Sequence, residues 1–106
     1  MKLITAYLHH VRVAPVVDAL ADAGFNNFIL QDVKGTLKPL EEAEQVYSSA
    51  ISLVISEAKL SLVCDEAQVS LVASIIRVSG SIGPDICGWV YVSTIDAALP
   101  IGGVAI

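Results

Sequence analysis

The sequence has few charged side chains and no long uninterrupted apolar run. Charged residues make up 16% of the 106 residues, and 6 Lys and Arg stand against 11 Asp and Glu, for a net charge of −5. This balance argues against a nucleic-acid-binding surface. The longest stretch without a charge or a hydroxyl, 97–106, contains Pro100 and Gly102, whereas a membrane-spanning helix needs about 20 consecutive apolar residues. We therefore predict no nucleic-acid partner and no direct membrane insertion.

Cysteine is also scarce, with only Cys64 and Cys87 in the chain. Two cysteines are too few for the disulfide framework of a small secreted domain, and they fit a reducing compartment. The N-terminal residues do not match a secretory signal, because Thr5, His9 and His10 interrupt any apolar core region. We therefore expect a cytoplasmic protein.

Apolar residues, in contrast, are abundant. They make up 55% of the chain, with a mean hydropathy of +0.71, where roughly 45–50% apolar residues is usual. A chain this short buries only roughly 60–65% of its unfolded surface on folding, so apolar surface is left over. The composition predicts a single domain, 1–106, that assembles into a homo-oligomer.

Periodicity and turn residues divide the chain into strands and helices. Apolar residues at helical spacing (Val13, Val16, Leu20) precede Gly24, which suits the end of a helix. In chain order the predicted elements are strand 3–9 with two apolar faces, helix 13–23, strand 28–34, strand 50–64, helix 65–78 and strand 89–93. The order predicts an α+β, ferredoxin-like βαββαβ fold with an antiparallel sheet. Helices cover only one face of such a sheet, so the other face needs a cover from assembly.

The predicted helix over 65–78 has two apolar stripes. Asp65 is expected to cap its N-terminus, with Gln68 completing a capping box. Beside the stripe expected to face the core, a second one contains Leu71, Ile75 and Val78. A helix that is apolar over most of its circumference is buried on more than one side, which again predicts subunit contacts.

Several short motifs, in the same order and at similar spacing, resemble the PII signal-transduction family over nearly the whole chain. They are Met-Lys-Leu-Ile-Thr-Ala at 1–6, Ala-Asp-Ala-Gly at 21–24, Val-Lys-Gly at 33–35, Glu-Ala-Lys-Leu at 57–60, Cys-Asp-Glu-Ala-Gln-Val at 64–69 and Gly-Trp-Val-Tyr-Val-Ser at 88–93. The resemblance implies a homotrimer with nucleotide clefts between subunits. It also implies that residues 36–55 form the family's long T-loop, which docks on transporters or enzymes, and that the Gly/Pro-rich loop 80–88 borders the cleft.

The chain departs from the family where typical members bind ATP, magnesium and 2-oxoglutarate. Pro39 replaces the glutamine that holds magnesium, Glu57 and Trp89 replace lysines, and the two arginines of the family's tail are missing. Lys38 is the cation left for phosphates. The resemblance therefore implies a weakened or altered ligand cleft between subunits, assigned to Gly35, Lys38, Gly83, Gly88 and Trp89. In that cleft AMP or ADP is expected rather than ordinary ATP and 2-oxoglutarate binding.

His9 and His10 are the metal-ligand candidates. Adjacent residues on a strand point to opposite faces, so we expect two structurally accommodated histidines. The alternative is that one of them joins a site shared between subunits, with Cys64, Cys87 or Asp85. Otherwise Cys64 is expected to be a buried small hydrophobe, and Asp85 part of a turn.

The resemblance and the residues together predict a regulatory protein rather than an enzyme. No Ser/His/Asp set, paired carboxylates or activated cysteine emerges from the sequence. The expected function is control of a partner, a membrane transporter or an enzyme, through the 36–55 segment. The alternative is a metal-responsive small trimeric protein that resembles the divalent-ion tolerance proteins.

Overall fold

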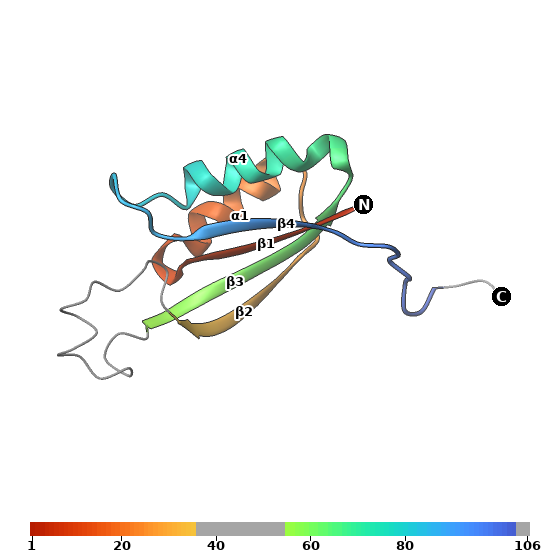
Figure 1. Cartoon of the computed structure of the whole chain (residues 1–106), viewed down its shortest axis with the longest axis horizontal. Helices are drawn as coiled ribbons and strands as arrows, with labels where there is room; N and C mark the ends of the chain where they lie inside the picture. The colour runs from red at the N-terminus through yellow and green to blue at the C-terminus, as the bar shows by residue number, and fades with distance from the viewer. Residues whose placement is uncertain (36–54, 104–106) are drawn as a thin grey trace.

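The computed structural model describes residues 1–35 and 55–103, and the chain there is α+β (Figure 1). The T-loop-like segment therefore lies outside the described residues, except for Ile55, which already belongs to a strand. The elements are β1 (Lys2–His9), η1 (His10–Arg12), α1 (Val13–Asp22), β2 (Phe28–Gly35), β3 (Ile55–Cys64), η2 (Glu66–Gln68), α4 (Val69–Ser79) and β4 (Trp89–Thr94), where η denotes a short 3-10 helix.

The four strands of the described residues form one antiparallel sheet in the order β2-β3-β1-β4. The two α-helices of the described residues, α1 and α4, lie on the same side of this sheet (Figure 1). The arrangement is compatible with the predicted ferredoxin-like fold. The strand that was expected from residue 50 is described from Ile55, and it is regular through residues 56 and 57.

The core lies between the helices and the face of the sheet that they cover. Alternate residues of the two central strands point toward the helices, and each helix buries two residues of its apolar stripe. The fully or nearly fully buried apolar side chains are Ile4, Ala6, Leu8, Val16, Leu20, Ala58, Leu60, Leu62, Cys64, Val72 and Ile76. Burial of each larger aliphatic side chain contributes about 1.5–3 kcal/mol to stability.

Helix ends follow the local signals in the sequence. Gly24 has a φ of 92°, as expected for the residue after a helix, and its backbone N–H donates to the Ala21 carbonyl at 3.0 Å. At the second helix, Asp65 and Gln68 form the predicted capping box, in which Gln68 Oε1 accepts the Asp65 backbone N–H at 3.2 Å. This first turn is a 3-10 helix, and the α-helix proper begins at Val69.

The sheet face opposite the helices, called the open face below, has no helix of the described residues over it (Figure 1). Within the single chain the first strand is covered on one side only, and Leu3, Thr5 and Tyr7 on its other face are half-buried. The helix over 65–78 was also expected to be buried on more than one side. Within one chain, Leu71 and Val78 remain 53% and 74% exposed, because α4 contacts the core with one stripe only.

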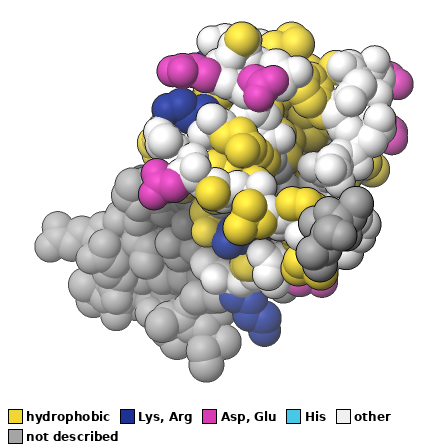
Figure 2. Space-filling view, turned by 90° about the vertical axis from the view of Figure 1, so that its right-hand side faces the viewer, with side chains coloured by type: hydrophobic (Ala, Val, Ile, Leu, Met, Phe, Trp, Pro, Cys, Tyr) yellow, Lys and Arg dark blue, Asp and Glu magenta, His cyan; other side chains and the backbone are white. Residues whose placement is uncertain are grey.

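Apolar side chains reach the surface on more than one side of the molecule. Figure 2 shows hydrophobic side chains exposed among a small number of charged ones. None of the helices within the described ranges is long and apolar enough to cross a membrane.

Candidate functional site

A pocket of about 240 Å³ opens on the open face of the sheet. Cross-strand pairing brings its walls together, because Tyr7 lies opposite Trp89 and Glu57 lies opposite Val33. Side chains of all four strands contribute, and three of them are aromatic. The lining residues are Tyr7, Val33, Lys34, Gly35, Glu57, Trp89 and Tyr91. We call this cavity the open-face pocket.

The aromatic wall of the open-face pocket is made by β1 and β4. Trp89 and Tyr91 share a strand face, as their spacing predicts, and are 47% and 54% exposed. The Tyr7 and Tyr91 rings meet edge to face, with centroids 6.0 Å apart, an arrangement that aromatic pairs favour. The wall therefore presents accessible aromatic surface to the cavity.

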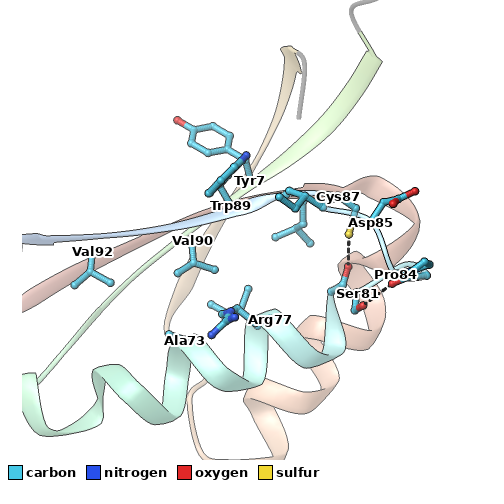
Figure 3. A pocket seen from close by; sticks show the side chains of 16 residues that line it. Tyr7, Ala73, Arg77, Ser81, Pro84, Asp85, Cys87, Trp89, Val90 and Val92 are labelled. Carbon is cyan, nitrogen blue, oxygen red and sulfur yellow. Dashed lines mark hydrogen bonds between the residues drawn. The ribbon is translucent and has the colours of Figure 1, made fainter. Parts of the chain in front are cut away.

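A larger groove of about 630 Å³ lies on the helix side of the sheet, between α4 and β4 and under the 80–88 loop. In Figure 3, Val90 and Val92 point from β4 toward α4, whereas Tyr7 and Trp89 lie on the other side of the strand. Arg77 on α4 extends into the space between the helix and the strand (Figure 3). We call this cavity the α4–β4 groove.

The structure divides the predicted cleft residues between the two cavities. Gly35 lines the open-face pocket, Gly83 and Gly88 line the α4–β4 groove, and Trp89 borders both. Lys38 lies outside the described residues. A single chain therefore does not bring the predicted glycines together into one nucleotide cradle.

The glycines of the 80–88 loop have conformational and packing roles. Gly83 has a φ of 63°, a value typical of glycine in a turn. A Cβ on Gly88 would collide with the Tyr7 carbonyl oxygen and lie 3.4 Å from the Leu8 Cα, so glycine is needed there for close approach of the backbones. Asp85, beside Pro84, is exposed and points away from the groove in Figure 3, in line with the predicted turn.

A cluster of His9, His10 and Glu57 lies at the end of β1 next to the open-face pocket. One ligand atom from each side chain is within 4.8 Å of the other two. The expectation that the adjacent histidines point apart is wrong, because β1 ends at His9 and η1 begins at His10. The change in backbone direction stacks the two rings, with centroids 4.9 Å apart and an interplanar angle of 28°.

Glu57 is the one buried charged side chain among the described residues, with an exposure of 1%. It lies opposite His9 in the β1–β3 pairing. Burial raises the pKa of its carboxyl group, while the nearby His9 and His10 rings and the His10 backbone N–H act in the opposite direction. Neither carboxylate oxygen has a hydrogen-bond partner of normal geometry, and the same holds for His9 Nδ1.

Neither cysteine belongs to this cluster. Cys64 is 6% exposed and faces the core at the far end of β3, as predicted. Burial, followed by the charge of Asp65, raises the pKa of its thiol, which lowers its reactivity. Cys87 is half-buried in the groove, where its thiol donates to the Gly80 carbonyl with a sulfur–oxygen distance of 3.6 Å.

Sequence reasoning missed three residues that line these cavities or the cluster. Glu57 was considered only as a change of charge relative to a family, and its burial had no local signal. Tyr7 alternates like any strand residue, and Arg77 is an ordinary charged residue in a predicted helix. Cross-strand pairing and helix orientation give all three their positions.

Searches with protein-family models and against curated proteins find no match to this chain.

Proposed function

We propose that the protein is a non-enzymatic, homotrimeric regulator that controls a membrane transporter or an enzyme through residues 36–55. The observation that carries this proposal is the position of the open-face pocket. Gly35, the last residue before the undescribed 36–54 segment, and Glu57, three residues after it, both line the cavity. A small molecule bound there would contact both ends of the segment.

Such a pocket provides a physical link between an effector and a docking segment. A ligand shifts a conformational equilibrium only by as much as it favours one state over the other. A ligand in the open-face pocket would contact residues next to both ends of the 36–54 segment. It could therefore bind one conformation of the segment more tightly than another. The resemblance to PII proteins, together with a fold compatible with theirs, supports the same assignment.

The lining of the open-face pocket favours a ligand with an aromatic ring and few negative charges. Trp89, Tyr7 and Tyr91 offer faces and edges on which a nucleobase can stack. Glu57 would repel phosphates, and each further phosphate adds negative charge near a carboxylate in a medium of low dielectric constant. AMP or ADP is therefore the proposed effector class, in preference to ATP.

Intrinsic fluorescence can test the effector directly, because Trp89 is the single tryptophan of the chain. We expect AMP and ADP to change the Trp89 emission, with ATP binding at least about tenfold more weakly, which corresponds to about 1.4 kcal/mol. The titrations should be repeated by calorimetry in the presence of EDTA. Trp89→Phe keeps an aromatic ring and should retain binding without the fluorescence signal.

Glu57→Gln is the control for the electrostatic part of the argument. Loss of the carboxylate charge should reduce the difference in affinity between ADP and ATP, while the aromatic wall of the open-face pocket stays in place. Wild-type binding of ATP as tight as that of ADP would contradict the proposed effector preference. Absence of all nucleotide binding would remove adenine nucleotides from the proposal.

The open face supports the homotrimer. Two large apolar side chains on this face lie outside the open-face pocket, and they are 65% and 45% exposed in the single chain: Ile29 and Val63. Exposed apolar patches mark interaction sites in soluble proteins. The open face has no helix of the described residues over it and has apolar residues at its centre. We therefore expect assembly to cover this face.

Charge placed on that face should break the assembly. We expect wild-type protein to elute as a trimer by light scattering, and Val63→Lys to shift it toward monomer by at least about tenfold in dissociation constant, because burial of an unpaired ammonium is unfavourable. Ala21→Lys, on the exposed side of α1, is the matched control and should remain trimeric. A monomeric wild type at micromolar concentration, or an unaffected Val63→Lys variant, would contradict the trimer.

The metal-responsive alternative is favoured by one observation, the His9–His10–Glu57 cluster. The cysteine that this alternative invoked is not part of it, because Cys64 faces the core at the other end of β3. As a second candidate function, metal sensing would use this cluster rather than a thiol.

A further inference from the structure

We propose that His9, His10 and Glu57 of one chain bind a divalent transition-metal ion. The site does not require the regulatory role or the nucleotide pocket, since it is complete in a single chain. It combines two imidazoles with one carboxylate, a donor set that suits zinc and its neighbours in the first transition row. Magnesium and calcium prefer all-oxygen sites.

Strand pairing and the end of β1 build the site. The β1–β3 register places His9 directly opposite Glu57, so both side chains leave the same face of the sheet. The backbone then turns into η1, which brings the His10 ring against the His9 ring. Two of the three ligands are therefore positioned by a sheet, and the third by a helical turn that follows at once.

The distances are close to those of a bound site. One ligand atom from each residue lies within 4.8 Å of the others. With bonds of about 2.0–2.1 Å, ligands of a tetrahedral zinc ion are about 3.3 Å apart. The three ligand atoms would therefore have to approach one another by up to about 1.5 Å.

Unpartnered buried atoms provide the independent observation. Both Glu57 oxygens and His9 Nδ1 are inaccessible to solvent and have no hydrogen-bond partner of normal geometry. A buried polar atom without a partner costs about 1–3 kcal/mol, and a buried charge costs more. A cation between the three side chains would compensate this cost. Simple packing of the same residues leaves it uncompensated.

The charge and access of the site fit the same ion. Two neutral imidazoles and one carboxylate would reduce the net charge of a site with a divalent ion to +1. Glu57 is the buried ligand, and its negative charge offsets part of the charge of the ion. His10 is exposed, which provides a route from solvent. Three protein ligands also leave one position of a tetrahedral ion for water.

Calorimetry with zinc on tag-free, chelator-treated protein tests the site. We expect one zinc ion per chain, with no binding of magnesium at the same concentration. Glu57→Gln and His9→Ala should each weaken zinc binding by about 100-fold or more, since loss of even an outer-shell partner typically costs 10–100-fold. Glu66→Gln makes the same change at an exposed site on η2 and should leave the affinity unchanged.

Folding has to be separated from ligation. His10→Ala changes an exposed side chain, so it should keep the wild-type circular dichroism and still lose zinc affinity. Cobalt provides a second readout, because its visible absorption reports the coordination of the ion, and Glu57→Gln should change that spectrum. Zinc binding at less than one ion per chain, or equal affinity in wild type and Glu57→Gln, would overturn the proposal.

Discussion

Replacement of Gly88 by alanine is expected to lower the free energy of unfolding by about 3 kcal/mol, at the upper end of the range for overpacked sites. The new Cβ would collide with the Tyr7 carbonyl oxygen and press on the Leu8 Cα. These are backbone atoms of the central strand β1, so they cannot rotate away as a side chain would. Relief of the clash requires β4 to separate from β1 at its first paired residue, Trp89.

Urea denaturation of wild type and Gly88→Ala at one chain concentration measures the effect. Gly35→Ala is the matched control, because a Cβ on Gly35 meets no atom within 4 Å and its φ is not in the left-handed region. That variant should stay within about 0.5 kcal/mol of wild type. A red-shifted Trp89 emission should accompany the loss in Gly88→Ala. An unchanged urea midpoint would show that β4 does not approach β1 as closely as described.

Replacement of Glu57 by methionine is expected to stabilise the protein, in contrast to the destabilising Gly88→Ala. In metal-free protein it should raise the free energy of unfolding by about 2 kcal/mol, because it removes a buried charge that has no hydrogen-bond partner of normal geometry. Methionine has a similar length and adapts to irregular packing. Most core substitutions destabilise a protein, so a gain at a fully buried position would be diagnostic of an uncompensated carboxylate.

The measurement is again urea denaturation, here with a chelator present and at one chain concentration. Glu66→Met serves as the control, because Glu66 is exposed and its replacement should change stability by less than about 0.5 kcal/mol. If zinc binds at the cluster, zinc at 100 times its Kd should stabilise wild type by about 2.7 kcal/mol and leave Glu57→Met unchanged. A metal-free Glu57→Met variant that is less stable than wild type would show that the carboxylate contributes to folding by itself.

Much of the fold could be predicted from local pattern. The helix stripe ending before Gly24, the Asp65–Gln68 capping box and the order of strands and helices all follow from residues close in sequence. Each depends on backbone dihedral preferences or on hydrogen bonds within one turn. The same reasoning identified the apolar second face of the sheet, because strand alternation has a period of two residues.

The sequence predicted the His9–His10–Glu57 cluster and the two cavities less well. Their residues are positioned by the pairing register between strands and by the change from β1 to η1 at His10. Nothing next to Glu57 in the sequence indicates that it lies opposite His9 and is buried there. The two histidines were expected to point apart, since the alternation rule holds only while the strand continues. The predicted cleft glycines lie in two cavities, because the sheet itself separates Gly35 from Gly83.

Composition and periodicity alone therefore determine the fold class and the surplus of apolar surface, because both are sums over local preferences. The tertiary structure alone decides which polar groups meet, because contacts such as Glu57 with His9 join residues 48 positions apart through the pairing of β1 with β3. Low charge was visible in the sequence from the start. Only the pairing of strands shows that one of these few charges is buried beside two imidazoles.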